Sequence, residues 1–130
     1  MASRNITAIA SAPSAAAIDR LVADLDRLRA RSPDDPPILS MLARALVWRG
    51  ERHQHDGDMA RARADWTRVR DLLAGRVSAT RDRNLLEAWV RTQVHLGARA
   101  QAAPQIAWLQ RAGYRHPGFV AFYEAAPQHP

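Results

Sequence analysis

Apolar residues recur every three or four positions along most of this chain, which is the spacing that places them on one face of an α-helix. The first stripe comprises Ile18, Leu21, Val22, Leu25 and Leu28. Ser14 precedes it, and serine is a residue type that caps helix starts. The segment 32–37 contains three prolines, which forbid helical continuation. The pattern therefore predicts a first helix that starts at about residue 15 and ends before Ser32.

Four further stretches have the same period and predict four more helices. The first of these starts near Pro36 or Pro37 and runs to about His53 or His55. The others cover about 59–73, 81–96 and 100–112, and a short last helix is expected over 118–125. The predicted buried faces consist of Ile38, Leu39, Leu42, Ala43, Leu46 and Val47, then Ala62, Trp66, Val69 and Leu73, then Leu85, Leu86, Trp89, Val90 and Gln93 or Val94, and finally Ala102, Ile106 and Leu109. No segment alternates with a period of two, so no strand is expected.

Turn and capping residues stand between these stretches. The helices are expected to end at Gly57, Gly75, Gly97 and Gly113, because glycine allows the backbone to turn. Asp58 is expected to cap the helix over 59–73, and Ser78 or Thr80 the helix over 81–96. The predicted fold class is therefore all-α, with five main helices and a short C-terminal one.

The chain repeats itself at about 40 residues. Gly57 and Gly97 are 40 positions apart, Ala62 and Ala102 have the same separation, and Trp66 aligns with Ile106. Each unit consists of a helix, a glycine turn and a second helix with a small residue followed by a large one. A small residue lets the returning helix approach closely, and the large residue fills the space opened by the crossing.

With these residues the chain resembles the tetratricopeptide repeat family, whose unit of about 34 residues is a helical hairpin. The matching positions are Leu46, Gly50, Gly57, Ala62 and Trp66 in one unit, and Leu86, Trp89, Gly97, Ala102 and Ile106 in the next. Arg49 departs from the pattern, which has a core leucine there, and Val90 replaces a small residue. The resemblance covers about 38–117 and implies antiparallel helical hairpins stacked in a right-handed array.

The resemblance also implies a groove lined by the first helix of each hairpin. Carried onto this sequence, the groove residues are Arg44, Val47, Glu51, Gln54 and His55 in the first unit and Asn84, Glu87, Arg91, Val94 and His95 in the second. A groove that contains Arg44 and Arg91 favours an acidic peptide or the C-terminal carboxylate of a partner. The expected function is that of a non-catalytic scaffold or adaptor that binds another protein or a peptide.

Composition narrows the classes of protein. A chain of 130 residues and 14.5 kDa fits one domain, expected over 14–126 between a flexible leader, 1–13, and a flexible tail, 127–130. Cysteine is absent, which excludes disulfides, thiolate nucleophiles and iron–sulfur clusters. No apolar run approaches the roughly 20 residues that cross a bilayer. All basic residues other than histidine are arginine, a bias typical of bacterial GC-rich genes, and the expected compartment is the cytoplasm.

The net charge of +6 leaves a second function open. A basic helical domain binds phosphates non-specifically, so nucleic-acid binding is the alternative hypothesis. Against it, arginines alternate with acidic residues on the predicted helix faces, as in Arg83, Glu87 and Arg91. Such interleaving is typical of solvated ion pairs.

Few residues are candidates for chemistry. His53, His55, Asp56 and Asp58 have metal-ligand side chains, but their spacing favours a polar helix end over a metal site. Glu51, Glu87 and Glu124 are expected on separate helix surfaces, and no nucleophile motif is present. We therefore expect no enzyme activity, no metal and no cofactor.

Three further predictions concern packing. Trp66 and Trp89 are expected in the core, whereas Trp48 and Trp108 are expected either between hairpins or on an exposed edge that docks a partner helix. The first helix is expected either to cover the open end of the stack or to form a homodimer.

Overall fold

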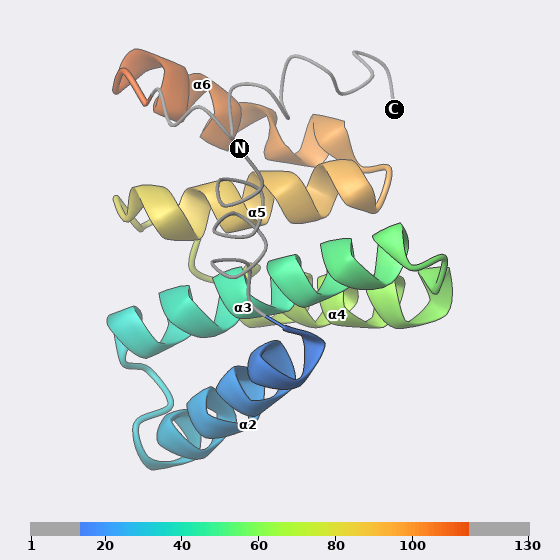
Figure 1. The fold of residues 1–130 in the computed structure, drawn as a ribbon. Helices are drawn as coiled ribbons and strands as arrows, with labels where there is room; N and C mark the ends of the chain where they lie inside the picture. Colours follow the sequence, from blue (N-terminus) through green and yellow to red (C-terminus); the bar gives the residue numbers. More distant parts are fainter. Residues whose placement is uncertain (1–13, 115–130) are drawn as a thin grey trace, which may run out of the picture.

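The computed structural model of this chain describes residues 14–114, and within this range the protein is helical and has no strand (Figure 1). The elements are α2 (Ala15–Arg31), α3 (Pro36–His55), α4 (Met59–Leu73), α5 (Arg83–His95), the 3₁₀-helix η1 (Arg99–Ala102) and α6 (Ala103–Arg111). The prediction of an all-α fold is confirmed. The helix expected over 118–125, the leader and the tail lie outside the described residues.

The helices pair as hairpins that lie side by side (Figure 1). α3 and α4 run antiparallel and pack against each other, and α5 and α6 form the next hairpin. α5 contacts both α3 and α4, and α2 packs on the opposite side of α3. α3 therefore contacts three other helices, and each hairpin shields apolar surface of its neighbour.

Three helix ends share one hydrogen-bonded turn. Gly57, Gly97 and Gly113 have φ angles of 83°, 75° and 72°, a conformation that side chains with a Cβ rarely adopt. After α3, the N–H of Asp58 donates to the carbonyl of His53 at 2.8 Å. The ends of α5 and α6 repeat this arrangement. The predicted bends at these glycines are confirmed. The three turns are alike because in each a glycine with positive φ follows the end of a helix.

Acidic side chains begin most of the helices. Asp35 caps α3 and Asp58 caps α4, while Ser14 caps α2 as predicted. The cap expected from Ser78 or Thr80 is wrong, because α5 begins at Arg83 and Asp82 accepts the N–H groups of its first turn. The hydroxyl of Thr80 instead accepts the N–H of Asp82 at 3.1 Å.

The last described helix also differs from the prediction of a single helix over 100–112. The chain forms η1 first and enters the α-helix only at Ala103. Pro104 explains the break, because its ring lacks an N–H and would clash with the carbonyl four residues earlier in a continuous α-helix. The tighter 3₁₀ turn before it avoids that clash.

The core forms where the apolar stripes meet. Trp66, Leu42, Leu46, Leu73 and Val90 are completely or almost completely buried. Trp89 is buried as predicted, and Trp108 is half-buried against the core. Leu28 is an exception at 46% exposure, because a 3.6-residue period carries the buried stripe from Leu25 to position 29.

None of the helices within 14–114 has both the length and the apolar character of a membrane span.

Candidate functional site

A hollow of about 160 Å³ opens between α3 and α5. Its lining takes four residues from each helix and one from the segment after α6. These residues are Arg44, Val47, Trp48 and Glu51 of α3, Asn84, Glu87, Ala88 and Arg91 of α5, and Tyr114. Each α5 residue stands 40 positions after an α3 residue of the set. The two helices therefore present the same repeat positions to the hollow, each set on one face because of its spacing.

The structure brings six of the ten predicted groove residues together here. They are Arg44, Val47, Glu51, Asn84, Glu87 and Arg91. The other four do not line the hollow. Gln54 and His55 are exposed near the end of α3, and Val94 is half-buried against the core. His95 lies nearby but is directed into the contact between the hairpins.

Three lining residues lie outside the predicted set. Trp48 and Ala88 directly follow Val47 and Glu87, so widening each predicted stripe by one helical position identifies them. Tyr114 belongs to no helix stripe. Its position after Gly113 gives no periodic signal, and only the path of the chain after α6 brings it to this hollow.

The acidic groups and one arginine of the hollow form a chain of ion pairs from α3 to α5. Oε2 of Glu51 lies 3.4 Å from Nη1 of Arg91, and Oε1 of Glu87 lies 3.9 Å from Nη2 of the same arginine. Glu87 is buried, which corrects its expected place on a helix surface. Because two carboxylates hold Arg91, its charge is paired within the protein.

Tyr114 extends this network, because its hydroxyl hydrogen-bonds to the Glu87 carboxylate. Burial, and then the negative charge of Glu87, raise the pKa of Tyr114 to about 12. The positive charges of Arg44 and Arg91 oppose this shift without cancelling it. The phenol therefore stays protonated at neutral pH and acts as a hydrogen-bond donor to Glu87.

Arg44 differs from the other charged groups of the hollow, which form ion pairs with one another. It has no carboxylate within 4 Å among residues 14–114, and its guanidinium carbon lies 5.5 Å from the ring centroid of Trp48. Trp48 itself is 43% exposed. An arginine over an exposed indole combines a cation with an apolar surface.

His95 does not line the hollow but contacts Glu51, which does. Its ring stacks on Trp66 of α4, with centroids 4.1 Å apart and planes 6° from parallel. Its Nε2 lies 2.9 Å from Oε2 of Glu51. The imidazole therefore links α3, α4 and α5 and fixes the Glu51 carboxylate in place.

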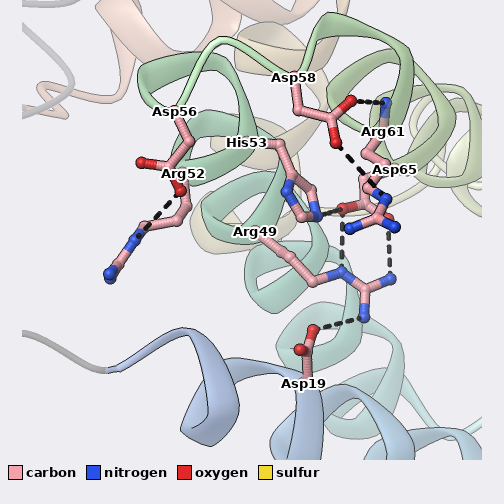
Figure 2. A network of polar contacts seen from close by, with 8 residues as sticks. All are labelled: Asp19, Arg49, Arg52, His53, Asp56, Asp58, Arg61 and Asp65. Atoms are coloured by element: carbon pink, nitrogen blue, oxygen red, sulfur yellow. Dashed lines mark hydrogen bonds and ion pairs between the residues drawn. The ribbon is translucent and has the colours of Figure 1, made fainter.

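A second polar network joins α2, α3 and α4 on another side of α3 (Figure 2). Nε and Nη2 of Arg49 donate to the two carboxylate oxygens of Asp65 at 2.9 and 2.8 Å, and Nη1 reaches Asp19 at 3.3 Å. Asp65 is 6% exposed. The hydrogen bonds to Asp65 raise the pKa of Arg49 above its usual range, against the opposing effect of burial. Arg49 thus occupies the position of the expected core leucine with its charge satisfied.

Three of the four metal-type side chains near the end of α3, namely His53, Asp56 and Asp58, have protein partners (Figure 2), and the fourth, His55, is exposed. His53 lies 3.8 Å from Asp65, and Asp56 lies 3.9 Å from Arg52. Asp58 caps α4 and pairs with Arg61. Within 14–114 no three histidine or acidic side chains are placed to hold a metal ion.

Comparisons of this chain with protein-family models, with curated proteins and with solved structures give no match. The resemblance to the tetratricopeptide repeat family therefore stays a prediction. The helical hairpins and the hollow between α3 and α5 are observed features of this chain.

Proposed function

We propose that this chain is a non-catalytic protein-interaction module of the cytoplasm. The hollow between α3 and α5 binds a peptide or a segment of a partner that carries a carboxylate next to an apolar side chain. Its helical hairpins and the 40-residue repeat of the lining support this proposal, since stacked hairpins expose extended surfaces suited to chain segments.

The observation that carries the proposal is the contrast between Arg44 and Arg91. Arg91 is held by Glu51 and Glu87, whereas Arg44 has no carboxylate partner among the described residues. A carboxylate from outside forms the charge-assisted, bidentate pair that a guanidinium favours. The neighbouring exposed indole of Trp48 gives an apolar residue of the same ligand a surface to cover.

A library of short random peptides tests this function. The wild-type protein should select peptides that carry Asp, Glu or a free C-terminal carboxylate. Replacing the selected carboxylate by its amide should weaken binding by about tenfold, which is the effect of losing one charge-assisted hydrogen-bonded pair. Arg44→Glu should abolish selection, and Trp48→Ala should weaken it.

The matched control is Arg63→Glu. Arg63 is exposed on α4 and has no carboxylate partner among residues 14–114, so this variant changes the net charge equally at a distant place. Equal peptide binding by Arg44→Glu and Arg63→Glu would reject the assignment of the hollow. Arg63→Glu should unfold at the wild-type temperature, because it removes no ion pair. Arg44→Glu loses the contact with Trp48 and adds a negative charge near Glu51 and Glu87, so its unfolding temperature should be slightly lower while the protein stays folded.

Nucleic-acid binding is the competing outcome. Several arginines are paired with acidic side chains, including Arg68 with Asp26 and Arg76 with Asp34. This pairing works against a continuous phosphate-binding stripe. Micromolar binding of a short duplex that falls steeply with salt, together with no peptide selection, would favour the alternative.

A further inference from the structure

A second hollow, of about 490 Å³, lies between the connector that follows α4 and one face of α6. It is separate from the hollow between α3 and α5 and shares no residue with it. The connector contributes Ser78, Thr80 and Arg81 to its lining, and α6 contributes Gln105, Trp108 and Arg111. The connector leads to the start of α5 on the side of the molecule where α6 ends (Figure 1).

The charge of this lining is of one sign. It contains Arg81 and Arg111 and no acidic residue. Neither arginine has a carboxylate within 4 Å among residues 14–114, whereas arginines elsewhere, such as Arg49 and Arg91, are held by acidic partners. Two guanidinium groups that share one hollow repel each other, so an anion between them is favourable.

Hydroxyl groups add to the donors of this site. Ser78 and Thr80 both line it. Oγ1 of Thr80 accepts the N–H of Asp82, which orients the side chain and leaves its own hydroxyl proton to donate elsewhere. The polar part of the lining is therefore rich in donors, as a group with several acceptor oxygens requires.

The rest of the lining is apolar, apart from one amide that lacks a hydrogen-bond partner among the described residues. Val77 and Leu86 are buried, and the indole of Trp108 is half-buried. Oε1 of Gln105 is buried and has no hydrogen-bond partner among the described residues. A half-turn of this amide presents its NH₂ group instead, so Gln105 has hydrogen-bonding capacity that the protein does not use.

The backbone around the hollow is held in place. Nη2 of Arg83 donates to the carbonyl of Ala112 at 3.4 Å and so ties the start of α5 to the end of α6. This contact keeps Arg81, just before α5, at the same end of the hairpin as Arg111. It also satisfies one carbonyl at the C-terminus of α6, whose partial negative charge would otherwise oppose an anion.

We propose that this hollow binds a phosphomonoester attached to an aromatic or other apolar group. The phosphoryl group carries up to two negative charges and three acceptor oxygens, which suits Arg81, Arg111 and the two hydroxyls. Trp108 and Leu86 then cover the apolar carrier. A small phosphorylated molecule and a phosphorylated aromatic side chain of a protein share this chemistry.

A titration of the ¹⁵N-labelled protein tests the proposal. Binding is monitored by the NMR signal of the Trp108 indole N–H. The probes are phenyl phosphate, inorganic phosphate, phenol and a short peptide that contains phosphotyrosine. Phenyl phosphate should shift this signal saturably and bind about tenfold more tightly than inorganic phosphate, because the ring buries apolar area that phosphate lacks. Phenol should not bind, because it lacks the charge.

The variant Arg81→Gln with Arg111→Gln should lower phenyl phosphate affinity at least about tenfold, since each guanidinium supplies charge-assisted bonds. The matched control is Arg20→Gln with Arg63→Gln, which removes two exposed arginines without carboxylate partners in the described chain and should bind as the wild type does. Unfolding temperatures of both variants are expected to equal that of the wild type.

Two results would overturn the proposal. One is the absence of a saturable shift with either phosphomonoester, and the other is equal affinity in the two double variants. Tighter binding of the phosphotyrosine peptide than of phenyl phosphate supports the site with a protein as the source of the phosphoryl group. Equal binding supports it with a small molecule as the source.

Discussion

The indole of Trp66 lies directly against the backbone of Gly50. A Cβ atom built on Gly50 would stand 2.4 Å from Nε1 of Trp66, closer than any ordinary contact. Trp66 is fully buried and also stacks on His95 of α5. One side chain of α4 thus contacts α3 and α5 at once, and the absence of a side chain at Gly50 makes this possible.

The substitution Gly50→Ala should therefore destabilise the protein. The added methyl group displaces a rigid indole in a packed core, which costs about 1–3 kcal/mol. The better helix propensity of alanine offsets up to about 1 kcal/mol of that cost. Urea unfolding followed by far-ultraviolet circular dichroism measures the difference in the free energy of unfolding.

The control for this prediction is Gly75→Ala. Gly75 has no positive φ, and a Cβ there would meet nothing within 4 Å. This variant should be as stable as the wild type or slightly more stable, since alanine restricts the unfolded chain. If Gly50→Ala were equally harmless, the close approach of α3 and α4 at Trp66 would be wrong.

The pair of Arg49 and Asp65 yields a second prediction. Asp65→Ala leaves the guanidinium of Arg49 partly buried with only the exposed Asp19, 3.3 Å away, as partner. We expect a loss of about 2–3 kcal/mol in the free energy of unfolding, because the partly buried charge keeps only one, solvent-exposed partner. Thermal and urea denaturation measure this loss.

A double substitution separates charge from packing at the same place. Arg49→Leu with Asp65→Ala removes both charges and installs the leucine that the repeat pattern favours. Its stability should return to within about 1 kcal/mol of the wild type, since apolar replacement of a buried pair is often neutral. A double variant that is less stable than the wild type by much more than this would show that the ion pair itself stabilises the fold.

The phenol of Tyr114 should lose its proton at a higher pH than an ordinary tyrosine. Absorbance at 295 nm, measured on a Tyr123→Phe background so that one tyrosine is observed, should show a pKa of about 12. The folded protein holds this proton more tightly than the unfolded chain, whose tyrosine titrates near about 10. The free energy of unfolding therefore falls as pH rises between these two values and does not depend on Tyr114 below them.

Glu87→Gln tests the causes of that shift. Removing the carboxylate should lower the pKa of Tyr114 only in part, because burial is the larger cause and persists in the variant. Asn84→Ala, which changes the lining without changing its charge, serves as the control. An unchanged pKa in Glu87→Gln would contradict the hydrogen bond between Tyr114 and Glu87.

The start of α5 provides a fourth prediction. Asp82→Ala should lower the free energy of unfolding by about 1 kcal/mol, which is the usual cost of removing a helix cap. Asp82 accepts the N–H groups of Asn84 and Leu85, at 2.9 and 3.2 Å. Ser78→Ala should not change the free energy of unfolding measurably. If Ser78→Ala lowered it more than Asp82→Ala does, Ser78 would be the cap.

The helices were predictable because burial imposes a period on the sequence. α4 follows the predicted range 59–73 because Asp58 and the stripe from Ala62 to Leu73 agree. The start of α5 was harder to place, since Ser78, Thr80 and Asp82 are all residue types that cap helices. Only the structure shows that Asp82 accepts the N–H groups of the first turn. Local sequence defines an element well, whereas it defines an end poorly when several caps compete.

The site was predictable only where one helix face decides the outcome. Arg44 and Arg91 lie on the expected faces of α3 and α5, and both line the hollow. Their different surroundings depend in part on neighbours far along the chain, since one of the two partners of Arg91, Glu51, is 40 residues away. Asp65 escaped prediction for the same reason, because a hydrophobic period counts only apolar residues and Arg49 lies on another helix.

The position of α3 among three other helices has a consequence for dynamics. Opening α3 breaks its contacts with α2, α4 and α5 together, so its amide hydrogens exchange with deuterium only when the whole domain unfolds. α2 packs chiefly on α3 and detaches at lower cost, so its amides exchange earlier. Exchange rates along the chain should thus decline from the outer helices to α3.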